Sequence, residues 1–298
     1  MPNTLLTPEN IASTAAALVG KGLGLAALLH RDLEAEFNAG SGDTVKIRVP
    51  GAIEAQTRGI YDTSTPLVSG SIAEKSIDVK LTTNAYTKVV LSEGDMDLEI
   101  ADFAKQVLLP QADSVVNYVE RTVASTMQAT PATKLTYDPA NPAKVFTLIR
   151  KQLRDNGVPT ESTLIAAVGS SVYTDLLDGP VGSSGTTFDA DGKVRGFQIV
   201  ESTRLAADEI VAFIPEAFAL VVRAPRVPEG APYGPSVTAD GFALRHIRAY
   251  DPSLAVDTST VNAFVGVSPM PLAVDRENGV VDLVANGGAV RVLTAATA

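Results

Sequence analysis

SIDVKLT (residues 76–82) and DTVKIRV (residues 43–49) share one pattern, in which apolar and polar side chains alternate along each stretch. A period of two residues is typical of a β-strand with one face buried and the other in solvent. The apolar positions are Ile77, Val79 and Leu81 in the first stretch and Val45, Ile47 and Val49 in the second. We therefore predict two half-buried strands that pair with one another.

The 26 residues from 50 to 75 connect these strands and show neither helical nor strand periodicity. A connection of this length without regular structure is uncommon in a compact domain, and it indicates a functional loop or disorder. A two-stranded hairpin with an irregular tip is not stable alone in water, and its edges invite pairing with another chain. Together with the long helix described below, the pattern favours an arm that contacts neighbouring copies, and the alternative is a disordered loop on a monomeric enzyme.

The composition limits the classes of function. The net charge of −10 argues against a nucleic-acid-binding protein, because phosphate contacts need clustered Lys and Arg. The absence of cysteine excludes disulfides, thiol catalysis and Cys-based zinc sites. No apolar run approaches the roughly 18–20 residues that span a bilayer, and the N-terminus lacks the pattern of a secretory signal. We expect synthesis inside the cell and no contact with a membrane.

Residues 93–129 carry the strongest helical pattern. Ser92 is the predicted N-cap, the first turn is acidic, and Pro110 should kink or break the helix. A continuous helix of this length would measure roughly 55 Å at ~1.5 Å per residue, which exceeds an ordinary small core. We therefore expect an elongated molecule whose ends pack against something else. Apolar stripes support the helix at Ile100, Phe103, Ala104, Val107 and Leu108, and again at Ala112, Val115, Val116, Val119, Val123 and Met127.

The remaining chain reads as mixed helix and strand. Thr7 and Pro8 begin two short N-terminal helical pieces, and Asn156-Gly157 ends a helix that starts near residue 143. Alternating elements then favour a small mixed sheet with helices. We predict a C-terminal hairpin that turns at residues 286–288. The predicted strands are 163–168, 197–202, 209–214, 241–251 and 260–270, with a short helix at 171–177 and a loop at 179–192.

No constellation of residues predicts catalysis, a cofactor or a metal. His30 and His246 lie far apart in sequence without a carboxylate at triad or metal-ligand spacing, so we interpret both as structural. The glycines of residues 20–24 follow no strand, residues 182–185 do not match a nucleophile elbow, and residues 189–192 form only part of a calcium loop. The acidic residues at the helix start suit the helix dipole. We therefore expect no enzymatic activity.

Four stretches in this order resemble the major capsid proteins of tailed phages, especially coat proteins of the phage P-twenty-two kind. The first runs from NTLLTPENIASTAAALV through GDTVKIRVP near the N-terminus, and the second is SIDVKLTTNAYTKVV with the helix that follows it. The third, EIVAFIPEAFALVVRAP (209–225), is similar to a strand followed by a short Pro-Glu-Ala-Phe-Ala-Leu helix. The fourth, GFALRHIRAYDPSLAVDTSTVNAFVGV, resembles the family's closing strands. The likeness covers most of residues 3–270.

The resemblance implies an α+β, Hong Kong 97-like capsid fold. Its expected parts are an N-terminal arm, an extended β-hairpin loop, a peripheral domain with a long spine helix, an apical α/β domain, and a C-terminal extension outside the recognised pattern. In this sequence they would occupy residues 1–42, 43–91, 92–142 with 245–275, 143–244, and 276–298, respectively.

The resemblance also implies self-assembly. Hexamers and pentamers of the chain would build an icosahedral head shell that encloses double-stranded DNA without sequence-specific binding. The expected further partners are a separate scaffolding protein, a portal and a decoration protein. The expected location is the virion, after assembly in the bacterial host cytoplasm. Two alternatives stay open: the shell of an encapsulin-like protein nanocompartment, and a soluble α/β hydrolase-type enzyme.

On this reading the hairpin carries the contacts between subunits, and its tip, from Arg58 to Glu74, should lie on an adjacent subunit. The candidate contact residues are Arg58, Tyr61, Asp62, Glu74, Lys75, Ile77, Asp78, Val79, Lys80 and Leu81.

Overall fold

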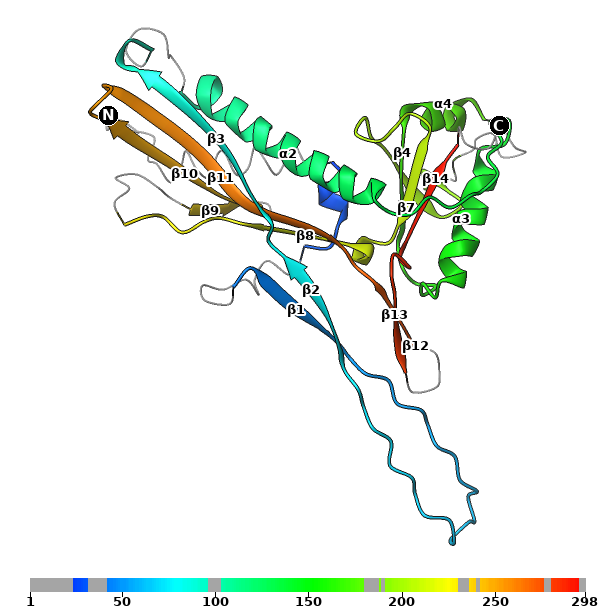
Figure 1. Ribbon diagram of the computed structural model, residues 1–298. Coiled ribbons are helices and arrows are strands. Elements are labelled where there is room, and N and C mark those ends of the chain that lie inside the picture. Colours follow the sequence, from blue (N-terminus) through cyan, green and yellow to red (C-terminus); the bar gives the residue numbers. More distant parts are fainter. Residues whose placement is uncertain are drawn as a thin grey trace, which may run out of the picture. The chain divides into compact units, whose positions relative to one another are not determined.

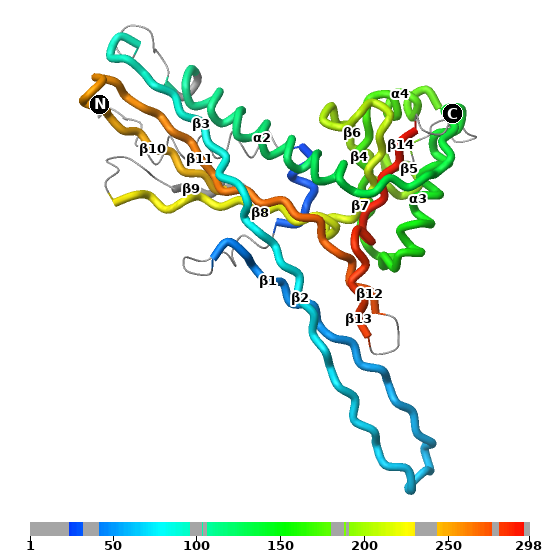
Figure 2. Tube along the Cα trace, viewed as in Figure 1, coloured from blue at the N-terminus to red at the C-terminus, as the bar shows by residue number. Residues whose placement is uncertain are grey.

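The chain forms two compact units in the computed structural model (Figures 1 and 2). The first contains residues 1–44, 80–129 and 218–268, and the second contains residues 45–79, 130–217 and 269–298. Each unit therefore joins segments that are distant in sequence. The structure describes residues 24–31, 42–95, 103–179, 188, 191–229, 236–239, 242–275 and 280–294.

A long antiparallel sheet is the framework of the first unit. Its strands follow the order β3, β11, β10 and β9, and β8 also pairs with β11. The predicted strands 241–251 and 260–270 are confirmed as β10 and β11, although β11 begins earlier than predicted. The register places Val261 of β11 between His246 of β10 and Thr87 of β3. The bounds are β3 (Thr83–Ser92), β8 (Phe218–Arg223), β9 (Ser236–Ala239), β10 (Phe242–Asp251) and β11 (Val256–Pro269).

Helix α2 (Leu109–Gln128) runs along this sheet beside β3 (Figure 1). The predicted apolar stripe faces inward, because Val115, Val119, Val123 and Met127 are at most 1% exposed. Pro110 lies in the first turn of α2, directly after the π-helical segment η4 (Ala104–Leu108), so the predicted irregularity at this proline is confirmed. A proline in the first turn does not cost an intrahelical hydrogen bond.

Ser92 caps the helical start that follows β3, as its sequence context predicts. Its hydroxyl accepts a hydrogen bond from the Asp95 amide at 3.1 Å, and the Asp95 carboxylate accepts one from the Ser92 amide at 2.9 Å. This reciprocal arrangement is a capping box. The residues from 96 to 102, over which the long helix was predicted to continue, lie outside the described part of the chain.

The second unit contains a mixed sheet in the order β14, β7, β4, β6 and β5. Strands β4 and β6 are parallel, and the other pairs are antiparallel. Strands β4 and β7 are buried along their whole length, which explains their unbroken apolar sequences. The bounds are β4 (Leu164–Val168), β5 (Lys193–Val194), β6 (Phe197–Glu201), β7 (Glu209–Phe213) and β14 (Ala289–Leu293), with helices α3 (Ala143–Asp155) and α4 (Ser170–Asp178).

Helix α3 ends where its sequence predicts. Gly157 has a φ of +101°, the left-handed conformation that glycine adopts without steric cost. Phe146 of α3 packs against Phe197 of β6, with ring centroids 5.9 Å apart. Both aromatic rings are fully buried, so they form a centre of this unit's core.

The predicted C-terminal hairpin is wrong in its pairing. A turn does occur at residues 286–288, where Asn286 has a φ of +54°. However, β13 (Val281–Val284) pairs with β12 (Leu272–Asp275), whereas β14 pairs with β7 at the edge of the larger sheet. The strand after the turn gains a buried partner in the core, which a local hairpin would not supply.

The expected helix in residues 215–220 is also wrong. Only Pro215–Ala217 form a helical turn, the 3₁₀ segment η5, and Phe218 then begins strand β8. Five of the six residues in β8 are buried. Burial on both faces of a sheet outweighs the weak helical preference of Ala and Leu.

The remaining elements are η1 and the hairpin strands. Segment η1 (Ala26–Leu28) is a 3₁₀ turn. The N-terminal cap at Thr7 and the glycines at 20 and 22 lie outside the described residues, as does most of the glycine-rich loop. Strands β1 (Thr44–Val49) and β2 (Lys75–Lys80) form a separate two-stranded sheet.

Candidate assembly interface

Strands β1 and β2 form the base of the hairpin, as the alternating sequences predict. The Leu81 amide donates a hydrogen bond to the Asp43 carbonyl oxygen at 2.8 Å, which joins the two chain segments where the hairpin begins. Val45, Val49 and Val79 are buried, while the polar positions between them are exposed. One face of the base is therefore already covered within this chain.

Beyond the base, the two arms approach closely. A Cβ atom on Gly51 would lie 2.5 Å from the carbonyl oxygen of Ala73 on the opposite arm, and one on Gly70 would lie 2.7 Å from the Ile53 side chain. Neither arm contains regular strand structure between residues 50 and 74, in agreement with the sequence pattern. Glycine at these two positions keeps the ribbon narrow.

A compact turn closes the hairpin. Asp62 Oδ1 accepts hydrogen bonds from the amide and hydroxyl of Ser64, both at 2.9 Å, and from the Thr65 amide at 3.1 Å. Hydrogen bonds from the side chain of Thr65 and from Ser64 hold the pKa of Asp62 well below its usual range. Arg58 donates to the Thr65 carbonyl oxygen at 2.8 Å. The turn therefore presents an ionised carboxylate in a defined local geometry.

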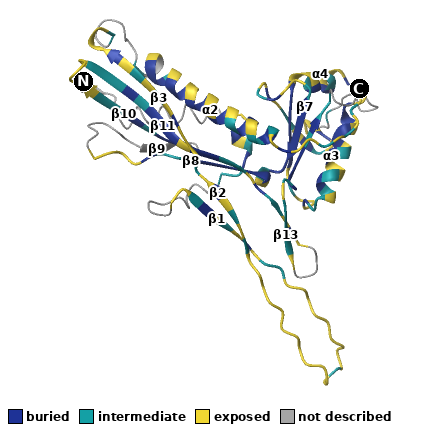
Figure 3. Ribbon diagram, in the orientation of Figure 1, coloured by how far each residue is buried: buried dark blue, intermediate teal, exposed yellow. Residues whose placement is uncertain are grey.

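Most of the hairpin beyond its base is exposed (Figure 3), and several large apolar side chains are among its exposed residues. Ile60 and Tyr61 at the turn are 94% and 95% exposed. Contiguous exposed apolar surface on a protein marks an interaction site or an aggregation hazard. We name the surface of Ile53, Ile60, Tyr61, Leu67, Val68 and Ile72 the apolar tip.

The ten candidate contact residues fall into three groups. Arg58, Tyr61 and Asp62 lie together at the turn. Val79 is fully buried within this chain, which leaves its side chain no surface for another subunit. The others line the return arm and its base: Glu74, Asp78 and Lys80 are exposed, and Lys75, Ile77 and Leu81 are half-buried.

Sequence reasoning missed Glu120, a carboxylate buried on α2. It accepts hydrogen bonds from the amides of Gly24, Leu25 and Ala26 at 2.7, 3.1 and 3.1 Å. These donors precede or begin η1, where backbone amides lack helical partners. The available signal was its spacing of four residues from Val116 and from Ala124, which places it on the buried face.

The segment that Glu120 holds continues into the sheet. The His30 amide donates to the Phe218 carbonyl oxygen at 3.3 Å, and the Leu220 amide donates to the His30 carbonyl oxygen at 3.0 Å. Residues 24–30 are thereby attached to α2 at one end and to β8 at the other.

His246 occupies a buried polar contact between helix and sheet. Its Nε2 atom lies 3.0 Å from the Ser259 hydroxyl, which donates to the side chain of Gln111 on α2 at 2.8 Å. Burial, with a further contribution from Arg248, lowers the pKa of His246 to about 4. A neutral, hydrogen-bonded imidazole with no carboxylate partner fits the structural interpretation of this histidine.

The described residues contain no group of three or more His, Cys, Asp or Glu side chains able to hold a metal ion. Nor does that part of the chain include a helix whose length and apolarity would let it cross a membrane.

Comparison with known proteins places this geometry in a fold family. No protein-family model and no curated protein sequence matches the chain. A protein of Mycobacterium phage Che8 is 16% identical, with a TM-score of 0.60 over 92% of both chains. The capsid of Ralstonia phage GP4 is 8% identical, with a TM-score of 0.59 over 89% of this chain and 87% of that one.

A virus-like particle from Pyrococcus furiosus is also similar, at 11% identity and a TM-score of 0.53, over 95% of this chain and 97% of that one. Identities this low report on fold, and the similarity extends along nearly the whole length of each chain. The chain therefore has the α+β, Hong Kong 97-like fold of tailed-phage capsid proteins, as its sequence resemblance implied.

Proposed function

We propose that this chain is the major capsid protein of a tailed phage, and that it assembles into the icosahedral head shell that encloses the double-stranded DNA genome. The observation that carries the proposal is the likeness to phage capsid structures over about nine-tenths of the chain. The exposed apolar tip supports it independently, because a protein that stays monomeric rarely leaves such a surface uncovered.

Each hairpin in such a shell contacts a neighbouring copy within a hexamer or pentamer. A single contact of this kind is weak, but several made at once raise the overall affinity without any new contact type. Closed symmetry then covers the surfaces that would otherwise cause open-ended aggregation. The contacts in this proposal come from the exposed or half-buried members of the ten candidate residues, with Arg58, Tyr61 and Asp62 at their centre.

We assign the parts of the fold accordingly: N-terminal arm 1–42, extended loop 43–91, peripheral domain 92–142 with 245–275, apical domain 143–244 and C-terminal extension 276–298. The additional partners in this proposal are a separate scaffolding protein, the portal and a decoration protein. The negative net charge suits a shell that surrounds DNA without gripping it. The place of assembly is the host cytoplasm, and the place of function is the virion.

Deletion of residues 55–72 tests the proposal. Every residue in this range is exposed except Asp62, which is partly so. The deletion should therefore leave a monomer with unchanged thermal stability that forms no shells when coexpressed with scaffold candidates. Size-exclusion chromatography and negative-stain electron microscopy give the readout. Normal shells from the deletion variant would refute the role of the hairpin, and a full-length chain that stays monomeric under every condition would refute the capsid function.

An encapsulin-like nanocompartment is the second candidate, since the chain is also similar in fold to a virus-like particle from Pyrococcus furiosus. The two candidates differ in what the particle contains. Nuclease-protected DNA in particles purified from infected or induced cells supports the phage head, whereas a single copurifying cargo enzyme supports the nanocompartment.

A further inference from the structure

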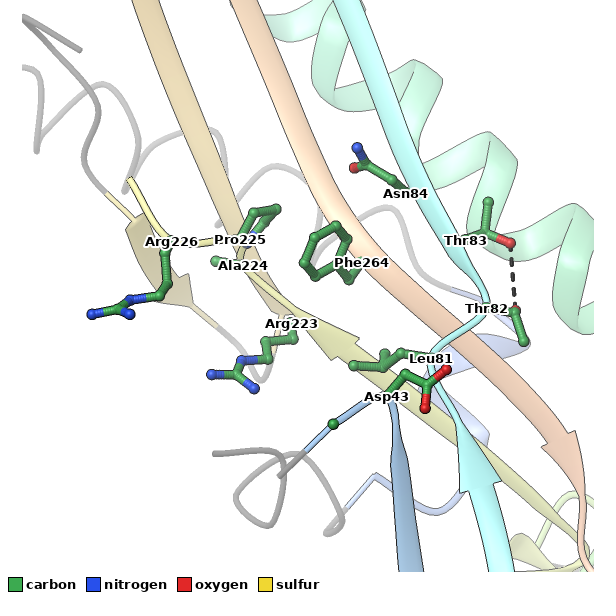
Figure 4. A pocket seen from close by; sticks show the side chains of 11 residues that line it. Asp43, Leu81, Thr82, Thr83, Asn84, Arg223, Ala224, Pro225, Arg226 and Phe264 are labelled. Atoms are coloured by element: carbon green, nitrogen blue, oxygen red, sulfur yellow. Dashed lines mark hydrogen bonds between the residues drawn. The ribbon is translucent and has the colours of Figure 1, made fainter. Parts of the chain in front are cut away.

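A groove of about 790 Å³ opens in the first unit beside the base of the hairpin (Figure 4). Its walls come from the end of β8, the chain just after β8, the start of β3 and the middle of β11. A groove of this size is sufficient for a large side chain with its neighbours. We name it the arginine groove, after a lining that includes Asp43, Leu81, Asn84, Arg223, Arg226 and Phe264.

Two cations in this groove lack partners within the described residues. Neither the Arg223 nor the Arg226 guanidinium makes a hydrogen bond or ion pair there, and Figure 4 shows both side chains directed to the same side. Of the two pockets described, only this one is lined by two arginines without partners, although the whole chain has a net charge of −10. Their chemistry suits a carboxylate, because the guanidinium fork matches carboxylate geometry.

The rest of the groove is suited to an aromatic or aliphatic side chain. Phe264 is 36% exposed, and Leu81 and Pro225 lie with it in the lining. Aromatic rings pack edge-to-face or offset against one another, and an arginine can stack over a ring. The lining therefore combines apolar side chains with two arginines, and it also includes the Asp43 carboxylate.

The groove adjoins the base of the hairpin, and the turn lies many residues further along the chain. Asp43 and Leu81 belong both to the groove and to the base of the hairpin, where they are joined by a backbone hydrogen bond. An extended arm from residue 43 to residue 60 measures roughly 55 Å at ~3.3 Å per residue. The close approaches of Gly51 to Ala73 and of Gly70 to Ile53 hold the arms together as a ribbon. We therefore expect a turn that enters the groove to come from another copy.

We propose that Tyr61 of one copy inserts into the arginine groove of another, with the Asp62 carboxylate paired to Arg223 and Arg226. The turn supplies the matching chemistry in sequence order: the apolar Ile60, the aromatic Tyr61 and the anionic Asp62. Ile60 and Tyr61 are almost wholly exposed, while the second oxygen of Asp62 makes none of the turn's own hydrogen bonds. Tyr and Arg are the residues enriched at energetic centres of interfaces. This inference rests on the proposed function and identifies the surface that receives the tip.

Charge exchange tests the pairing. The double variant Arg223→Glu with Arg226→Glu should lower shell yield on the order of tenfold. A tenfold loss of affinity corresponds to ~1.4 kcal/mol, which is less than the loss of one strong interface hot spot. Adding Asp62→Arg to that variant should restore part of the yield, because it re-forms opposite charges but removes the acceptor for Ser64 and Thr65. Arg223→Lys with Arg226→Lys keeps the charge and is the matched control. Unchanged yield in the Glu variant, or the same loss in the Lys variant, would overturn the inference.

Cysteine cross-linking tests the contact directly, since the natural chain has no cysteine. Tyr61→Cys combined with Asn84→Cys should give covalent oligomers on a non-reducing gel after mild oxidation of assembled shells. Tyr61→Cys combined with Lys193→Cys, at an exposed residue of the second unit, is the control and should stay monomeric on the gel. Equal cross-linking in both pairs would contradict the inference. Assembly of the wild-type chain is scored first, so a failure of the proposed function is recognised separately.

Discussion

At the residue scale, buried polar groups hold the first unit together at defined points. Glu120 attaches the segment before η1 to α2, and His246 joins the sheet to the same helix through Ser259 and Gln111. A buried polar group is tolerated only when it is hydrogen-bonded, so each of these contacts is also specific in its position. Their removal has consequences that exposed residues do not share.

Replacement of Glu120 by Gln should lower the free energy of unfolding by roughly 1–3 kcal/mol, since a neutral amide is a weaker acceptor for three amides and adds a donor without a partner. Urea denaturation followed by circular dichroism measures this change. Asp113→Asn on the exposed face of α2 is the matched control and should change little. Faster hydrogen exchange at the amides of residues 24–26 in E120Q should accompany the loss. An E120Q protein with wild-type stability and exchange would show that the attachment is unimportant.

His246 should make the fold sensitive to acid. Its pKa is about 4 in the folded chain, below the ordinary value of 6.5. Between these two pH values the unfolded chain binds a proton that the folded chain does not, so stability falls as the pH drops from about 6.5 toward 4. The loss reaches up to about 3 kcal/mol, since each pKa unit corresponds to ~1.4 kcal/mol. Unfolding free energies measured from pH 7 to pH 4 should fall less steeply in His246→Gln than in the wild type, and equal slopes would contradict this origin.

At the element scale, local pattern predicted the structures whose burial repeats regularly along the chain. Alternation over 43–49 and 76–82 indicated β1 and β2, and the stripe from Val115 to Met127 indicated the buried face of α2. The errors occur where non-local packing decides. Residues 218–223 carry helix-compatible Ala and Leu but fill a buried strand, and residues 289–293 pair with β7, which lies almost eighty residues earlier.

The candidate contact residues show the same contrast between local pattern, which the sequence reveals, and non-local packing, which it does not. Sequence reasoning found the arm and its turn, because the unpatterned connection is visible in the sequence. It did not find Glu120 or the arginine groove, because each is assembled from segments that meet only in the folded chain. The fully buried Val79 was proposed as a contact residue because alternation identifies an apolar face without saying what covers it.

The narrow ribbon should depend on glycine at one position and not at another. A side chain at Gly51 would clash with the Ala73 carbonyl, whereas one at Gly59 would meet its nearest neighbour, Asp62 Cβ, at an ordinary 3.6 Å. Gly51→Val should therefore separate the arms and lower shell yield several-fold. Gly59→Val should assemble more efficiently than Gly51→Val. Both monomers should keep the wild-type melting temperature, because the arms are exposed. Yield by sedimentation and melting by calorimetry separate the two effects, and equal yields would argue against a requirement for a narrow ribbon.

At the scale of the whole molecule, each copy has one apolar tip and one arginine groove, so the proposed contact between copies is head-to-tail. Head-to-tail contacts close into rings when the rotation between copies is suitable, and they otherwise extend without limit. Under the proposed capsid function, the contacts must close rather than extend. Because every subunit both gives and receives a tip, the loss of one function in a few subunits should interrupt whole rings.

This asymmetry leads to a prediction for mixed assembly. A chain that lacks residues 55–72 keeps its groove, so it should accept a wild-type tip. It has no tip of its own to insert into the next copy. Added at one part in five during assembly, it should reduce the yield of wild-type shells by much more than one fifth, because a ring with one defective member does not close. The same deletion combined with Arg223→Glu and Arg226→Glu loses both functions and should reduce the yield far less. Light scattering and electron microscopy of mixtures at fixed total concentration measure the effect. If both deletion chains inhibit equally, the groove does not receive the tip, and giving a tip and receiving one are not linked as we propose.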